Sequence, residues 1–157
     1  MTDERTWCLD TSALINPWKG YYAPDLAPGY WRTLPEMVVR GRSVVSEEVR
    51  EEIERADDGL WSWTQANISS WHPLTDEVQA VVTEIMARWG RLVDSRKLRS
   101  RADPFVIATA KVVGATVVTS EGYGTENKPQ IPFVCSQLDV QCVDIFEFAR
   151  LAGIPLV

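Results

Sequence analysis

The sequence predicts an α/β fold in which helices cover both faces of a parallel sheet of about four or five short strands. Apolar segments of strand length alternate with longer segments whose apolar residues recur at helical spacing. Several strand-like segments end at an acidic residue, and some helical segments begin with one. The 157 residues, 45% of them hydrophobic, suffice for the core of a single domain spanning 1–157.

The first third of the chain opens with the apolar segment 6–10, which predicts a short buried strand. Thr11 or Ser12 can cap the helix that follows. Residues 17–31 contain three prolines, two glycines and five aromatic side chains, a composition typical of an aromatic-lined loop. The further elements expected here are helix 30–40 ending at Gly41, strand 43–45 and helix 47–56.

The rest of the chain continues the alternation. Thr75 is a good N-cap for a long helix. Residues 103–113 are nearly all apolar and stop at Gly114, which predicts a deeply buried helix. The β-branched residues of 115–119 predict a central strand. The remaining expected elements are helix 58–70, loop 122–132, strand 140–144 and helix 144–152.

Charge and cysteine content argue against some classes of protein. A net charge of −6 and a pI near 4.8 do not suit a nucleic-acid-binding protein, although carboxylates that bind metal are neutralised in a working site. Three cysteines and one histidine do not make a zinc site, so buried reduced thiols are expected. No apolar run reaches the ~20 residues of a membrane span. The N-terminus lacks a secretory signal, so we expect a cytoplasmic protein.

Acidic residues stand where a parallel sheet would bring them to one end. Asp10 ends the first strand, and Glu121 follows the central strand in the same way. Asp103, followed by Pro104, opens a helix and can also serve as its N-cap. Each acid alone is explained by a turn or a cap, but carboxylates gathered in one cleft repel each other unless divalent cations neutralise them. Their joint placement therefore predicts a metal site.

A further acid is chosen from the glutamates of 47–52 by helical geometry. Val49 and Ile53 define the buried stripe of this helix. At ~100° per residue, Glu52 lies roughly 80° from the centre of that stripe and Glu48 roughly 120°. Glu52 is therefore the first choice and Glu48 the second, since the helix dipole alone explains acids in a first turn.

Positive charge is concentrated in residues 88–101, which hold six basic residues against one acid and run directly into Asp103. Such a run is either solvated surface or a phosphate contact. The candidates for contacting a phosphate of a substrate are Arg99, Arg101 and Lys128. Base stacking is a possible role for Tyr21, Tyr22 and Trp31. Exposed aromatic surface at 17–31 or 58–71 could instead form a homodimer or partner interface.

Five segments of the chain, which contain the acidic residues described above, resemble the PIN-domain nucleases, most closely a VapC-like toxin branch with an expanded aromatic N-terminal half. The matching segments are CLDTSALI at 8–15, SVVSEEVREEIE at 43–54, ADPFVIATA at 102–110, VVTSE at 117–121 and KPQIPFVC at 128–135. The resemblance implies a three-layer α/β/α fold and an endoribonuclease dependent on Mg²⁺ or Mn²⁺, often the toxin of a toxin–antitoxin pair. It also implies a metal-binding and catalytic set of Asp10, Glu52, Asp103 and Glu121, with the hydroxyls of Ser12 and Thr119 beside it.

The chain departs from the PIN-domain pattern at one acid, and two functions other than a nuclease are also considered. Many family members have aspartate where this chain has Glu121, whose side chain is one methylene longer. A catalytically inactive PIN-like binding module that acts through a protein partner, such as a basic antitoxin, would suit the acidic net charge. A phosphatase of small phosphate esters is disfavoured, because the segment DTSAL lacks a second aspartate two residues after Asp10.

Overall fold

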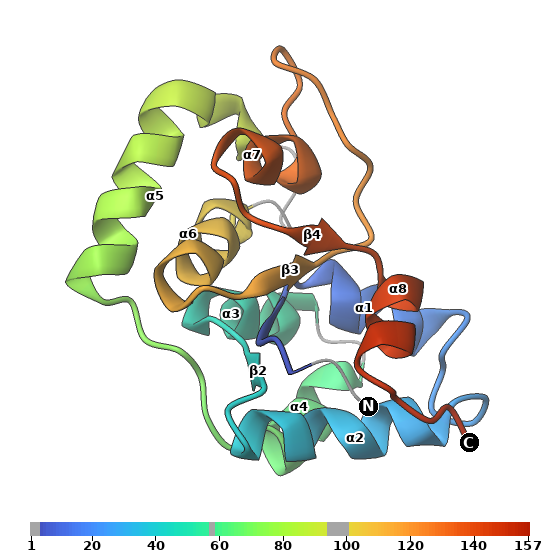
Figure 1. The fold of residues 1–157 in the computed structure, drawn as a ribbon. Helices are drawn as coiled ribbons and strands as arrows, with labels where there is room; N and C mark the ends of the chain where they lie inside the picture. Colours follow the sequence, from blue (N-terminus) through green and yellow to red (C-terminus); the bar gives the residue numbers. More distant parts are fainter. Residues whose placement is uncertain (1–3, 57–58, 94–100) are drawn as a thin grey trace.

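In the computed structural model, which describes residues 4–56, 59–93 and 101–157, a parallel sheet lies between layers of helices (Figure 1). The strands are β1 (Trp7–Leu9), β2 (Ser43–Val44), β3 (Thr116–Val118) and β4 (Cys142–Val143). The helices are α1 (Ser12–Lys19), α2 (Pro28–Val39), α3 (Glu47–Ala56), α4 (Leu60–Asn67), α5 (Asp76–Trp89), the 3-10 turn η1 (Gly90–Leu92), α6 (Asp103–Val113), α7 (Ile131–Gln137) and α8 (Ile145–Leu151).

The sheet has the strand order β2-β1-β3-β4, and every neighbouring pair is parallel. In the register of the sheet, Cys8 of β1 lies between Val44 of β2 and Val117 of β3. All residues of β1 and β3 are buried, as expected for central strands that are covered on both faces. The predicted α/β fold with a central parallel sheet is confirmed. Next to β2, Ser46 forms one further parallel bridge with His72.

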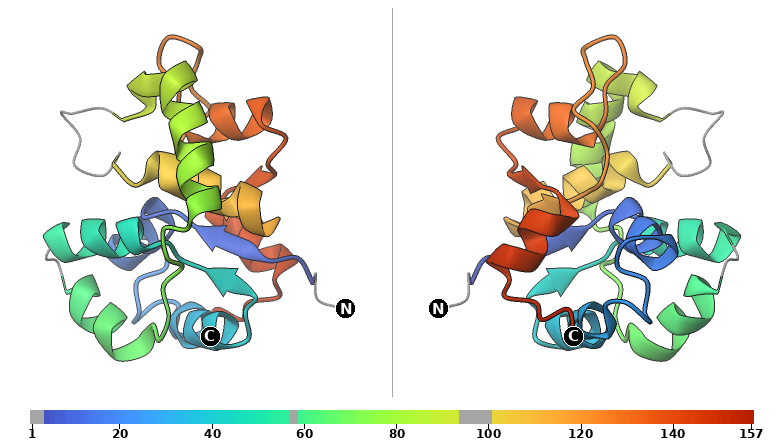
Figure 2. Two further views of the ribbon diagram at one scale, coloured as in Figure 1. Left: turned by 90° about the vertical axis from the view of Figure 1, so that its left-hand side faces the viewer. Right: turned by 90° about the vertical axis from the view of Figure 1, so that its right-hand side faces the viewer.

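Side chains of β1 alternate between the two helical layers. Trp7 packs edge-on against Phe148 of α8 with ring centroids 5.1 Å apart, and Phe148 contacts Tyr30 of α2. The next residue, Cys8, donates its thiol to the carbonyl of Val106 in α6 at 3.5 Å. Successive strand residues face opposite sides of a sheet, so α2 and α8 cover one face and α6, with α5 packed on it, covers the other (Figures 1 and 2). This is the predicted three-layer α/β/α arrangement.

Two helix boundaries follow the sequence signals directly. The side chain of Thr75 accepts a hydrogen bond from the N–H of Val78 at 3.2 Å and caps α5. Helix α6 has Pro104 in its first turn and ends at Gly114, whose φ of 74° lies in the left-handed region that favours glycine. No helix in the described ranges is both long and apolar enough to cross a lipid bilayer.

The aromatic loop predicted over 17–31 is wrong at both ends. Helix α1 extends into its start, and α2 already begins at Pro28, because a proline in a first turn gives up no helical hydrogen bond. Trp31 is only 4% exposed and lies against Trp18 and Trp63, with ring centroids 5.1 and 4.9 Å away. The rings of this segment therefore serve largely as core.

Candidate metal centre

The strand order places the candidate site at the carboxyl ends of β1 and β3. From β1 the chain connects to β2 on one side of it, whereas β3 lies on the other side. Ligand sites in open parallel sheets form outside the strand ends at such a switch point. Asp10 follows β1 and donates its backbone N–H to Val118 at the end of β3, at 3.0 Å. Glu121 follows β3, so the fold brings the two acids to the same edge, as the sequence predicts.

Asp10 is 2% exposed, and the side chains that bond to it hold one of its two oxygens. Its Oδ2 accepts hydrogen bonds from Ser12 Oγ at 2.6 Å and from Thr119 Oγ1 at 2.9 Å. Its other oxygen, Oδ1, is buried without a hydrogen-bond partner in the described part of the chain. Ser12 therefore orients a carboxylate, and the expected side-chain cap of α1 by Thr11 or Ser12 is not formed. An oriented acid with one open oxygen is suited to bind a cation.

Two polar residues that sequence reasoning missed extend this network. The N–H of Ser120 donates to Ser12 Oγ at 2.9 Å, and Asn16 Nδ2 donates to Ser120 Oγ at 2.5 Å. Asn16 lies one turn after Ser12 on α1, so both face the end of β3. That spacing is the only sequence signal for Asn16, and it is weak because it does not say which strand the helix faces.

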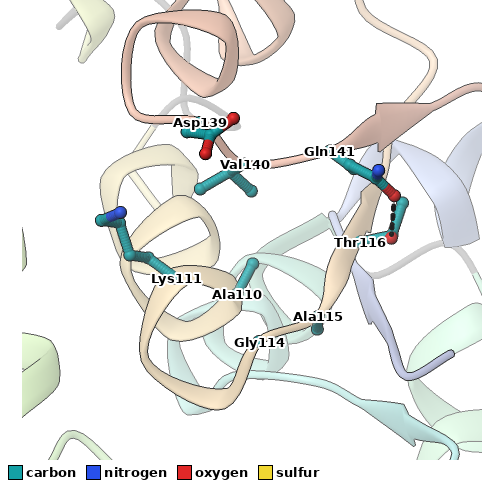
Figure 3. A pocket seen from close by; sticks show the side chains of 8 residues that line it. All are labelled: Ala110, Lys111, Gly114, Ala115, Thr116, Asp139, Val140 and Gln141. Carbon is teal, nitrogen blue, oxygen red and sulfur yellow. Dashed lines mark hydrogen bonds between the residues drawn. The ribbon is translucent and has the colours of Figure 1, made fainter.

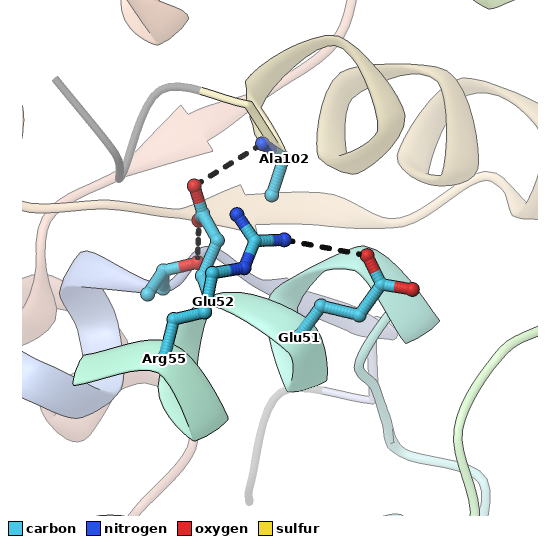
Figure 4. A network of polar contacts seen from close by, with 5 residues as sticks. Glu51, Glu52, Arg55 and Ala102 are labelled. Carbon is cyan, nitrogen blue, oxygen red and sulfur yellow. Dashed lines mark hydrogen bonds and ion pairs between the residues drawn. The ribbon is translucent and has the colours of Figure 1, made fainter. Parts of the chain in front are cut away.

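Glu52 of α3 is 4% exposed, and both of its oxygens are engaged (Figure 4). Oε1 accepts a hydrogen bond from the hydroxyl of Thr11 at 2.5 Å, and Oε2 accepts one from the N–H of Ala102 at 3.3 Å. The second-choice acid, Glu48, is half-buried, and the carboxylates that act on it are Glu47 and Glu51. Of the two choices, Glu52 is the acid whose charge acts on Asp10 and Asp103.

Asp103 is the first residue of α6 and is 3% exposed. The residue at the N-cap position is Ala102 and no side-chain cap is formed, so the expectation that Asp103 caps this helix is wrong. Its carboxyl instead shares a hydrogen bond with the side chain of Glu121. Two carboxyls this close together oppose each other's ionisation, which a bound cation would relieve.

Burial and mutual repulsion both act on the pKa values of this cluster. Burial raises the pKa of Asp10, and the hydrogen bonds from Ser12 and Thr119 only partly oppose the effect. Burial raises the pKa of Glu52 to about 7, against the hydrogen bonds from Thr11 and Ala102. The pKa of Asp103 is raised well above its usual range by burial, then by the charges of Asp10, Glu121 and Glu52. The four predicted acids therefore lie close enough to influence one another's ionisation.

The donor set fits a hard divalent cation, although the present arrangement is not closed around one. All the candidate donors are carboxylate oxygens, which Mg²⁺ and Mn²⁺ prefer over nitrogen or sulfur. The unpartnered Oδ1 of Asp10 is a buried acceptor of the kind that a cation would satisfy. In the described residues, no three acidic, histidine or cysteine side chains are arranged to hold a metal ion. The hydrogen bond between Asp103 and Glu121 would have to open before both could turn toward one.

The predicted phosphate contacts are only partly described. Arg99 lies outside the described residues, while Arg101 is exposed two positions before Asp103. Lys128 is exposed on the loop after Glu121, where Arg91 donates to the carbonyl of Asn127 at 3.4 Å. The same loop carries Tyr123, which is 57% exposed. Base stacking by Trp31 is excluded by its burial, and Tyr21 and Tyr22 both contact the ring of Phe146.

A separate cavity of about 180 Å³ lies at the opposite end of the sheet (Figure 3). Gly114 and Thr116, at the start of β3, are among its lining residues. Three of its polar side chains bond within the protein: Lys111 Nζ donates to the carbonyl of Leu138 at 3.0 Å, and Thr116 donates to Gln141 at 3.4 Å. The acids, not this cavity, therefore form the candidate site.

Comparison with known proteins gives a family without an assigned activity. The model of a family described as a domain of unknown function (DUF4411) matches residues 7–156. A search of curated proteins found no match to the chain.

Proposed function

The chain belongs to the DUF4411 family, and we propose that it is an endoribonuclease that hydrolyses RNA phosphodiester bonds with Mg²⁺ or Mn²⁺. The observation that carries this proposal is the gathering of Asp10, Glu52, Asp103 and Glu121 from distant parts of the chain at one end of the sheet. The resemblance of the segments around these acids to the PIN-domain nucleases supports it. Three of the four acids, Asp10, Glu52 and Asp103, are buried, and gathering them with Glu121 has a free-energy cost that a cation in the cluster would offset.

Asp10, Asp103 and Glu121 are the residues best placed to hold the ion. Asp10 offers the open Oδ1, and its orientation is set by Ser12 and Thr119 on Oδ2. Asp103 and Glu121 offer carboxyl oxygens that now face each other and would turn to the ion. A bound divalent cation would activate water and neutralise charge on the phosphate.

Substrate contact falls to the basic residues next to the acids. Arg101 precedes Asp103 by two positions, and Lys128 stands on the loop that follows Glu121. Both are exposed, so both can reach a phosphate of a bound strand, and Arg99 belongs to the same proposal. Exposed Tyr123 on the same loop offers a ring face to an unpaired base, which favours single-stranded RNA.

The proposed biological role is the toxin of a type II toxin–antitoxin pair acting in the cytoplasm. It follows from the resemblance to the VapC-like branch. A basic antitoxin would complement a chain with a net charge of −6. A homodimer is a further proposal, for which the groove lined by Pro24, Trp31 and Trp63 is a candidate surface.

One observation favours the alternative of an inactive PIN-like binding module. Asp103 and Glu121 hydrogen-bond to each other, and no ready ligand set exists among the described residues. If the acids served only to hold the fold, the protein would act through a partner and would bind no cation. The two functions therefore differ in a measurable property, cation binding by Asp10.

The test is cleavage of a mixed-sequence single-stranded RNA with Mn²⁺, and with a chelator in its place. Asp10→Asn and Asp103→Asn should each lower the rate by at least about 100-fold, because each removes a charge required by the ion. Glu51→Gln is the matched control: Glu51 is exposed on the same helix as Glu52, and its ion-pair partner within the described ranges is Arg55, at 3.5 Å. Cleavage that persists in the chelator or in either Asn variant would reject the metal mechanism.

A further inference from the structure

We propose that Glu52 is a positioning residue that fixes the two sides of the cleft, and that it does not bind the cation itself. This inference rests on the proposed function, because it assigns a role within the same site. The proposal divides the four acids into two groups. Three of them offer an oxygen to the ion, whereas both oxygens of Glu52 accept hydrogen bonds from the protein itself.

The partners of Glu52 are the immediate chain neighbours of two other acids. Thr11, which donates to Oε1 at 2.5 Å, follows Asp10. Ala102, whose N–H donates to Oε2 at 3.3 Å, precedes Asp103. One carboxylate on α3 thus ties the end of β1 to the start of α6 (Figure 4). A shift of either partner would move an acid, and a misplacement of about 1 Å in a catalytic site costs on the order of 100-fold in rate.

The contrast with Asp10 supports this division of roles. Both side-chain hydrogen bonds to Asp10 fall on Oδ2, and Oδ1 is buried without a hydrogen-bond partner among the described residues. The two hydrogen bonds to Glu52 are spread over both oxygens, one on each. Glu52 therefore uses both of its oxygens to connect two segments of the chain, whereas Asp10 has one oxygen, Oδ1, that is available to a cation.

The start of α6 also needs an acceptor that its own residues do not supply. The first N–H groups of a helix have no acceptor within the helix, and the methyl side chain of the N-cap residue Ala102 cannot accept a hydrogen bond from them. Glu52 accepts the N–H of Ala102 from a different helix, at the end of α6 where the helix dipole favours negative charge. The contact therefore holds the first turn of α6, which carries Asp103.

The experiment measures Mn²⁺ affinity by calorimetry and RNA cleavage in one set of variants. Glu52→Gln keeps the shape and can accept from Ala102 and donate to Thr11. Its Mn²⁺ affinity should stay within about 3-fold of the parent, and its kcat within about 10-fold. Thr11→Val removes one contact and should lower kcat by about 10–100-fold, and Thr11→Ser should restore it. Asp10→Asn should abolish Mn²⁺ binding, and Glu51→Gln should behave as the parent.

The outcomes separate the two proposals. If Glu52→Gln weakens Mn²⁺ binding as much as Asp10→Asn does, Glu52 is a ligand and the positioning role is wrong. A folded Thr11→Val variant with the parent's kcat would also overturn it. If the Mn²⁺ pattern is as expected but neither the parent protein nor any variant cleaves RNA, the nuclease proposal fails, while the conclusion that Glu52 is not a ligand of the cation stands. A parent protein that binds no Mn²⁺ would overturn both.

Discussion

Raising the pH from 5 to 8 without a divalent cation is expected to destabilise this protein. Burial raises the pKa of Glu52 from an ordinary 4.5 to about 7 in the fold. Between these values the folded state keeps a proton that the unfolded chain has released, so the free energy of unfolding falls as the pH rises. A difference of about 2.5 between the two pKa values corresponds to a loss of about 3 kcal/mol. Asp10 and Asp103 have pKa values raised in the same direction and add to this loss.

The assay is urea unfolding at pH 5, 6, 7 and 8 in the presence of a chelator. With a urea dependence of about 1–3 kcal/mol per molar, a loss of about 3 kcal/mol moves the midpoint down by about 1–3 M. Adding Mn²⁺ at pH 8 should reverse the loss, since a ligand at 100 times its Kd stabilises the fold by about 2.7 kcal/mol. The reversal should be much smaller at pH 5, because the raised pKa values of Asp10 and Asp103 let protons compete with the cation for their oxygens.

Two variants show whether Glu52 is responsible. Glu52→Gln removes the titrating group, so the difference in unfolding free energy between pH 5 and 8 should shrink by about 3 kcal/mol. Glu51→Gln, which alters an exposed acid on the same helix, should follow the parent. The reasoning is refuted if the parent protein grows more stable from pH 5 to 8 in the chelator, or if Glu52→Gln keeps the parent's full pH dependence.

The remaining predictions concern the support of the site and the fold. Ser12→Ala removes the 2.6 Å hydrogen bond to Asp10 and should lower RNA cleavage by about 10–100-fold with an unchanged circular dichroism spectrum. An unchanged rate would show that Thr119 alone orients the acid. Trp31→Ala empties a buried site and should cost about 3–5 kcal/mol in urea unfolding; a loss below 1 kcal/mol would contradict the core assignment. Gly114→Ala should cost about 1–2 kcal/mol by the same assay, from backbone strain at φ 74° alone, because the added Cβ meets no neighbour; an unchanged midpoint would refute this.

Local signals sufficed for elements whose causes lie within a few residues. The boundaries of α6 follow from Pro104, an apolar run and Gly114, and the position of Glu52 follows from its angle to the buried stripe of α3. The segment 17–31 was misjudged because its composition is that of a loop, while its rings gain their stability from partners such as Trp63, which is remote in sequence. Helix α7 was missed for a similar reason, since its seven residues follow a proline-containing loop and have too short an apolar pattern to identify.

The polar network of the site could not be predicted for a different physical reason. Asn16 and Ser120 are ordinary surface residue types, and their contact exists only because α1 packs beside the end of β3. The bridge from Glu52 to Thr11 and Ala102 likewise joins three elements that sequence patterns describe separately. Carboxylates could be anticipated because strand ends converge, but their hydrogen-bond partners depend on atomic positions that only the folded chain defines.

The acidic composition is less of an argument against an RNA substrate than the formal net charge suggests. That value of −6 counts every acid as ionised, including the four in the cluster. The raised pKa values of Asp10, Glu52 and Asp103 mean that these three groups resist ionisation together. If protons or cations neutralise all four, a net charge of about −2 remains. The charge that an approaching RNA would meet is then set largely by residues outside the cluster, such as exposed Arg101, two positions before Asp103.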